Sequence, residues 1–194
     1  GGAQNAVHGL SAVAVGGTLN IAKGMNTFVG AGHLSKATAD YSVVVGGLCN
    51  SAAALSSVVV GGKGNTALGQ GAAIVGGIGN TASGQYGAVA GGSSNEASGT
   101  QSFIGGGCDN TASGQYGAVA GGYTNCAEGT ASTIAGGNCN CVRSGGTYGT
   151  IAGGLSGFVE CCGDFLGGGI NGKVCACYGC NTIVGGCGNS LTST

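Results

Sequence analysis

The sequence lacks proline and tryptophan altogether, and only 6% of its 194 residues are charged. Without proline, and without glycine at every third position, the chain is not a collagen triple helix. Disordered segments are rich in proline and charge, so 42% hydrophobic residues and a formal net charge of −1 predict an ordered chain. With so few charges the chain has no basic surface that would bind nucleic acid. No apolar run approaches the roughly 18 residues of a transmembrane helix, so membrane insertion is not expected either.

Glycine, in contrast, is abundant, with 48 residues, and it follows a fixed period. Glycine pairs begin at positions 1, 16, 46, 61, 76, 91, 106, 121 and 136, and an asparagine stands four positions later in each repeat. Self-similarity at such a period is typical of a solenoid, in which one repeat makes one coil and cannot bury its apolar side alone.

Each repeat is numbered here from its first glycine as position 0. Position 6 is a small residue, position 13 is mostly valine or isoleucine, and apolar residues alternate with period two around both, which is the pattern of strands. Glycines at positions 0, 1 and 8 are expected where the chain reverses, because glycine adopts positive φ without strain. The sequence therefore predicts an all-β parallel β-solenoid of about 12–13 two-stranded coils. The asparagines at position 4 are predicted to stack as a side-chain amide ladder.

Two regions are expected along this solenoid. Residues 1–140 form the regular 15-residue-repeat part, with a slip in register near residues 28–35, where the turn comes one residue early. Residues 141–194 form an irregular, cysteine-rich continuation or cap, because their turn glycines return at uneven intervals.

Positions 12 and 14 flank the inward residue at position 13 and should point outward, yet they are apolar. A strand that is apolar on both sides is normally covered on both sides. The two strands of one coil cover only each other's inward side, so the outward side needs another cover. These side chains are therefore candidates for a homo-oligomer interface: Val43, Val45, Val58, Val60, Val75, Ala88 and Ala90.

Eleven cysteines indicate an oxidising, extracellular or cell-surface setting. Cys126 and Cys141 are fifteen residues apart, as are Cys162 and Cys177, so each pair should occupy adjacent coils within disulfide reach. The other cysteines cannot be paired from the sequence, and an odd count is consistent with disulfides between chains.

A metal site is the weaker interpretation of the last cysteines. Cys175, Cys177 and Cys180, with Cys187 as a fourth ligand, have a spacing compatible with thiolate ligation. No nucleophile, base and orienting acid share a face of adjacent coils, so neither an enzyme nor a cofactor is expected.

The strings GGIGNTASGQYGAVAGG, YSVVVGGLCNSAA and SSVVVGGKGNTALG resemble the YadA-like, or Hep/Hag, head repeats of trimeric autotransporter adhesins. The resemblance covers about residues 1–140. It implies a left-handed parallel β-roll that trimerises through apolar strands, in a family whose heads bind host matrix or cells.

The sequence thus predicts an extracellular structural protein that self-assembles through apolar solenoid faces and disulfides into a fibre, sheath or layer. The alternative is a trimeric adhesin or phage-fibre head that binds a host surface through the irregular segments at 141–148 and 158–164. Ice binding would require an unbroken threonine ladder, and position 5 instead interrupts its threonines with serine, glutamate and cysteine.

Overall fold

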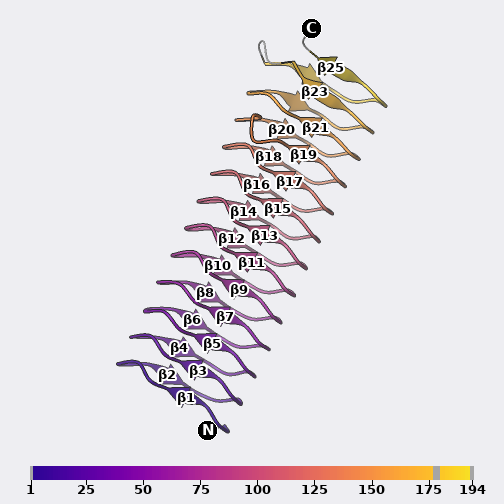
Figure 1. The fold of residues 1–194 in the computed structure, drawn as a ribbon. Coiled ribbons are helices and arrows are strands. Elements are labelled where there is room, and N and C mark those ends of the chain that lie inside the picture. The colour runs from indigo at the N-terminus through magenta and orange to yellow at the C-terminus, as the bar shows by residue number, and fades with distance from the viewer. Residues whose placement is uncertain (1, 177–179, 193–194) are drawn as a thin grey trace. The chain divides into compact units, whose positions relative to one another are not determined.

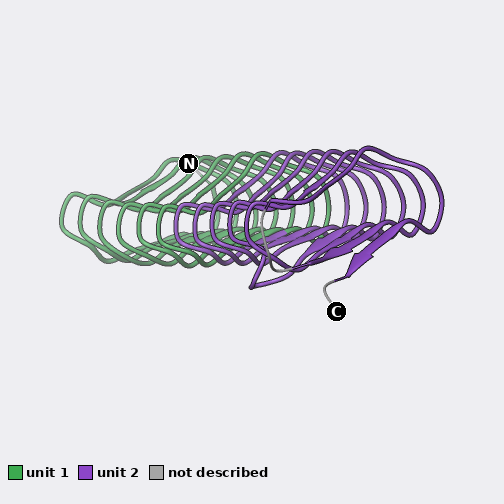
Figure 2. Ribbon diagram, turned by 90° about the horizontal axis from the view of Figure 1, so that it is seen from above, with its two compact units in different colours: residues 1–95 green, residues 96–194 purple. Residues whose placement is uncertain are grey.

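The computed structural model describes residues 2–176 and 180–192, and these residues form an all-β parallel β-solenoid without a helix (Figure 1). The chain divides into two compact units, residues 1–95 and residues 96–194, which Figure 2 shows in green and purple. Within each unit the odd-numbered strands form one sheet, here the odd sheet, and the even-numbered strands form a second one, the even sheet.

The first unit has six short strands in each sheet among its described residues. Its odd sheet consists of β1 (Ala6–Val7), β3 (Ile21–Ala22), β5 (Lys36–Ala37), β7 (Ser51–Ala52), β9 (Thr66–Ala67) and β11 (Thr81–Ala82). Its even sheet consists of β2 (Val13–Ala14), β4 (Phe28–Val29), β6 (Val43–Val44), β8 (Val58–Val59), β10 (Ala73–Ile74) and β12 (Ala88–Val89).

The second unit repeats this arrangement. Its odd sheet consists of β13 (Glu96–Ala97), β15 (Thr111–Ala112), β17 (Cys126–Ala127), β19 (Cys141–Val142), β21 (Phe158–Val159), β23 (Lys173–Cys175) and β25 (Ser190–Thr192). Its even sheet consists of β14 (Phe103–Ile104), β16 (Ala118–Val119), β18 (Thr133–Ile134), β20 (Thr150–Ile151), β22 (Phe165–Leu166) and β24 (Thr182–Ile183).

The fifteen-residue period is the length of one coil. Thr66 pairs with Thr81 in the odd sheet and Ala73 pairs with Ala88 in the even sheet, both in parallel register. Identical repeat positions therefore stack directly on one another, at the roughly 4.8 Å spacing of neighbouring strands. The predicted fold class is confirmed.

The predicted slip near residues 28–35 is wrong. Phe28 pairs with Val13 on one side and with Val43 on the other, each fifteen residues away. Only the first glycine of the pair is missing there, as Ala31, while the second, Gly32, keeps its positive φ of 119°. A side chain at position 0 meets nothing, as at Gly61, whereas a Cβ on Gly32 would lie 2.3 Å from the carbonyl oxygen of Gly47.

Beyond residue 140 the coils continue with two-residue insertions. Cys141 pairs with Phe158, seventeen residues on, whereas Thr150 pairs with Phe165 at the ordinary fifteen. The units themselves divide at residues 95 and 96, so a domain boundary at residue 140 stays a prediction.

The core of each coil is one thin layer. Alanines of the odd sheet, such as Ala67 and Ala82, face valines and isoleucines of the even sheet, such as Val59 and Ile74, and all four are fully buried. Small residues on one side leave room for β-branched residues on the other, which gives the close packing that protein interiors require.

The glycine at position 8 serves close packing and not a positive φ. A Cβ on Gly69 would lie 1.9 Å from the carbonyl oxygen of Gly84 in the next coil. Positive φ falls instead at position 1, as in Gly62 at 88°, and at positions filled by ordinary residues, such as Leu19 at 60° and Tyr86 at 56°.

The asparagines at position 4 form a buried stack, but their amides mainly bond the backbone. The Nδ2 of Asn65 donates to the carbonyl oxygens of Gly61 at 2.9 Å and Gly77 at 3.0 Å. Its Oδ1 accepts the backbone N–H of Asn80 at 2.9 Å. The predicted amide-to-amide bond occurs between Asn125 and Asn110, at 3.0 Å. Each asparagine thus closes its own turn and ties it to the next coil.

Candidate functional site

The outer surface of the even sheet in the first unit is apolar, and we call it the valine face. It consists of Val13, Val15, Phe28, Val43, Val45, Val58, Val60, Ala73, Val75, Ala88 and Ala90. The seven residues predicted as interface candidates all lie on it. Val45, Val60 and Val75 are 46%, 42% and 57% exposed, whereas Val43, Val58 and Ala88 are half-buried.

Alternation along each strand creates this face. Val44, Val59 and Ile74 point inward and are fully buried, so the residues on either side of them must point outward. Register then aligns the outward residues into ladders, with Val43 beside Val58 and Val58 beside Ala73. None of the eleven side chains can ionise, so the face has no charge to repel an apolar partner.

The outer surface of the odd sheet differs in composition. In the first unit it includes Lys36, Ser51 and Thr66 at position 5, and Lys23 and Thr38 at position 7. In the second unit the same two positions include most of that unit's charged residues: Glu96, Glu128, Arg143, Glu160 and Lys173. The odd sheet therefore presents charged and polar side chains outward beside apolar ones such as Ile21 and Leu68, whereas the valine face presents apolar side chains alone.

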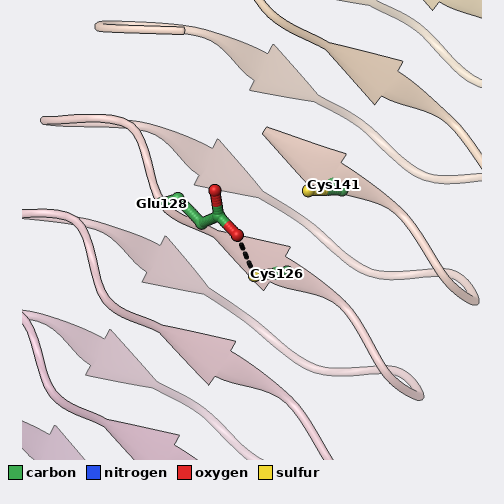
Figure 3. A group of neighbouring side chains, drawn as sticks. All are labelled: Cys126, Glu128 and Cys141. Atoms are coloured by element: carbon green, nitrogen blue, oxygen red, sulfur yellow. Dashed lines mark hydrogen bonds between the residues drawn. The ribbon is translucent and has the colours of Figure 1, made fainter. Parts of the chain in front are cut away.

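A group of three ligating side chains lies on the odd sheet of the second unit. Cys126 and Cys141 are register partners on β17 and β19, and Glu128 follows Cys126 by two residues, so its side chain lies on the same side (Figure 3). The Cys126 Sγ donates to the Glu128 Oε1 at 3.4 Å. The ligand atoms of all three lie within 4.8 Å of one another, and each residue is half-buried.

The two thiols of this group titrate differently. A hydrogen bond with Cys141, followed by burial and the nearby Glu128 carboxylate, raises the pKa of Cys126 well above its ordinary value. The same hydrogen bond, with the positive charge of Arg143, lowers the pKa of Cys141. Both shifts favour ionisation of Cys141 before Cys126.

The structure places Cys126 and Cys141 side by side in register, as predicted, and both thiols are free. Side chains of in-register parallel strands project side by side, so their Cβ atoms stay about as far apart as the strands, roughly 4.8 Å. A disulfide needs Cβ atoms about 3.8 Å apart. The sequence-based estimate considered only the Cα atoms, which lie within the permitted range.

The second predicted pair is untested. Cys162 has a free thiol, and Cys177 lies outside the described residues. The neighbouring Cys161 is disulfide-bonded. Of the four residues of the alternative metal group, Cys177 again lies outside the description, while Cys175 donates to the Glu160 Oε2 at 3.3 Å.

Sequence reasoning missed Glu128. Position 7, directly after the strand, lies on the same side of the chain as position 5, and position 5 of the next coil pairs with position 5 of the first. Comparing these three positions together would have revealed the cysteine, the carboxylate and the second cysteine as one group.

Two further findings bear on function. Among the described residues, none forms a helix of the length and apolarity needed to cross a membrane. The sequence matches no protein-family model and no curated protein.

Proposed function

We propose that this protein is an extracellular structural protein that self-assembles through its valine face, with disulfides between chains, into a cell-surface fibre, sheath or layer. The observation that carries the proposal is the valine face itself, an exposed ladder of apolar side chains without an ionisable group. Monomeric proteins seldom expose contiguous apolar patches of more than a few hundred Å².

A second copy of the chain is the partner that fits this face best. Its outward side chains repeat at the strand spacing of about 4.8 Å, and only a surface with the same repeat can interdigitate with them along its whole length. Another copy presents that surface by construction. Association through an apolar face also accounts for a chain with so few charges, since near-neutral apolar surfaces associate readily.

The alternative function, a trimeric adhesin or phage-fibre head, is favoured by one observation. The first two-residue insertion lies between β19 and β20, where Arg143, Ser144 and Gly145 are exposed and Tyr148 is 67% exposed. Irregular exposed loops on a rigid scaffold are common binding sites. Self-association through the valine face would serve this function too, as a closed trimer.

Electron microscopy and light scattering of the purified full chain test the proposal. We expect regular filaments, hoops or sheets, and we expect Val60→Lys to dissolve them because it places a charge in the apolar ladder. Thr66→Lys is the matched control. It puts the same side chain at position 5 of the opposite face, where Lys36 is native, and should leave assembly intact.

Three results separate the possibilities. A monomer at micromolar concentration would overturn the proposal, and so would assemblies that Val60→Lys leaves unchanged. Discrete trimers that bind a host surface, and that Val60→Lys dissociates, would support the adhesin alternative.

A further inference from the structure

We propose that Cys126, Glu128 and Cys141 form a binding site for a divalent metal ion of the zinc type, on the outer face of the odd sheet in the second unit. The site lies on the sheet opposite to the even one and does not depend on self-assembly. One metal ion would then link two successive coils, because Cys126 of β17 and Glu128, the residue directly after β17, supply two ligands and Cys141 of β19 supplies the third (Figure 3).

The donor atoms are close to the arrangement that zinc requires. Zinc–sulfur bonds of about 2.3 Å and zinc–oxygen bonds of about 2.1 Å in a tetrahedron place a sulfur roughly 3.6 Å from the oxygen and roughly 3.8 Å from the other sulfur. The Cys126 Sγ and Glu128 Oε1 are already 3.4 Å apart. All three ligand atoms lie within 4.8 Å of one another, so rotation of side chains closes the site without movement of the backbone.

The strand register favours a metal over a disulfide at this position. In-register strands hold the two Cβ atoms roughly 4.8 Å apart, which is wider than a relaxed disulfide allows. A metal ion between two thiolates tolerates this spacing, because two metal–sulfur bonds span a longer gap than one sulfur–sulfur bond. Both thiols are free in the structure and half-buried, so they remain accessible to an ion from solvent.

The surroundings suit a site of net negative charge. Two thiolates and a carboxylate contribute three negative charges, so the site with a divalent ion bound has a net charge of −1. Arg143 lies at position 7 of the coil that contains Cys141, and its guanidinium carbon is 5.2 Å from the centre of the Phe158 ring. This packing holds a positive charge beside the site, which compensates for the remaining negative one.

The chemistry of the ligands selects the ion. Thiolates favour zinc and other soft or borderline ions over magnesium and calcium, which prefer oxygen ligands alone. Three protein ligands leave a fourth tetrahedral position for a water molecule. Thr111 and Phe158 occupy the same ladder position in the neighbouring coils, so neither side of the stack adds a fourth charged ligand.

Titration of the reduced full chain with Co²⁺, followed by competition with Zn²⁺, tests the proposal. Co²⁺ bound by two thiolates in a tetrahedral site should give a sulfur-to-metal charge-transfer band and strong visible d–d bands, which Zn²⁺ should abolish. Cys126→Thr and Cys141→Thr should each reduce the number of bound ions by one per chain. Threonine is native at this ladder position in Thr66, Thr81 and Thr111, so these variants keep the repeat intact.

Cys139→Ser is the matched control. Cys139 is an exposed free thiol in the turn that leads from β18 into β19, and its loss should leave the stoichiometry unchanged. In the wild type, Zn²⁺ should protect Cys126 and Cys141 from alkylation while Cys139 stays reactive. Glu128→Gln should weaken binding at least about tenfold, because it removes an anionic ligand.

The proposal is overturned if the threonine variants bind as many ions as the wild type. It is equally overturned if Zn²⁺ leaves the alkylation of Cys126 and Cys141 unchanged, or if gently isolated protein contains a disulfide between them.

Discussion

The two halves of each coil have the same backbone arrangement, a turn followed by a short strand. They differ in the residue that closes the turn, in the core residue and in the outward side chains. In most coils the half that leads into the odd sheet is closed by an asparagine, is filled with alanine and presents the charged side chains, among others, outward. The half that leads into the even sheet is closed by a serine, glycine or other small residue, is filled with valine or isoleucine and, in the first unit, presents apolar side chains outward.

The difference separates what stabilises the coil from what the coil offers to a partner. The inward side chains of both halves must pack closely, so residue size varies little along the chain at each inward position. Outward residues obey no such demand. The proposed function therefore rests on these outward residues.

The largest expected effect compares the two turns. Asn65→Ala removes three hydrogen bonds, to the carbonyls of Gly61 and Gly77 and from the N–H of Asn80. Because these backbone groups are shielded from water, we expect the free energy of unfolding to fall by about 4 kcal/mol. Chemical denaturation of the reduced protein measures this.

Ser57→Ala is the comparison on the other turn. The Ser57 Oγ bonds the carbonyl of Ala54 at 2.7 Å and accepts its N–H at 3.1 Å, but Ala72 occupies the same position one coil later. We expect a loss of only about 1 kcal/mol. Equal losses for the two variants would mean that the halves are not closed differently.

The next effect compares the inside and outside of one strand. Ile74 is fully buried, and truncation to alanine leaves a cavity in a layer one side chain thick, so Ile74→Ala should cost about 3 kcal/mol. Val75→Ala, at the neighbouring residue that is 57% exposed, should cost under about 1 kcal/mol. Denaturation in dilute, disassembled protein distinguishes the two. A similar cost for Val75→Ala would show that the valine face is already buried in the folded chain.

The inward-facing residues could be predicted from the sequence. A period of fifteen, alternation within it, and valine or isoleucine at position 13 determine the strands, their register and the core, since only one register places every residue of position 13 in the interior. The glycine pair correctly predicted one turn, because position 1 needs both positive φ and the absence of a side chain.

Other features have no local signature. Leu19 and Tyr86 have positive φ and each donates its N–H to the preceding coil, to Ala3 and Gln70, but neither residue type predicts positive φ. The group of Cys126, Glu128 and Cys141 depends on two strands at once, and its free thiols depend on the direction of the Cβ bonds. The predicted slip near residue 30 was wrong because a side chain at position 0 clashes with no other atom. Alanine can therefore replace glycine there without strain.

A smaller effect probes the polar face through its two thiols. In metal-free, reduced protein at about pH 8, Cys141 should be alkylated at least about tenfold faster than Cys126, because the thiolate is the reactive form. The pKa of Cys141 is lowered, so its thiolate fraction is larger at a pH below the ordinary thiol value, whereas the raised pKa of Cys126 keeps its proton on. Timed alkylation with mass spectrometry of the two peptides measures the ratio. Equal rates would contradict the shared hydrogen bond.

The smallest effect concerns the coil of the first unit that has a serine at both turn positions, Ser35 and Ser42. Ser35 stands where the other regular coils of the first unit have asparagine. It donates its N–H to the Asn20 Oδ1 at 3.0 Å, but its own Oγ finds no partner in the described residues. Ser35→Asn should add the bonds that Asn50 makes one coil later, to the carbonyls of Gly46 and Gly62. We expect a gain of about 1 kcal/mol in the free energy of unfolding. Ser51→Asn makes the same chemical change on the outer face of β7 and should alter stability by less than about 0.5 kcal/mol. A gain for Ser51→Asn as large as that for Ser35→Asn would mean that asparagine stabilises the chain by its propensity, and not by closing the turn.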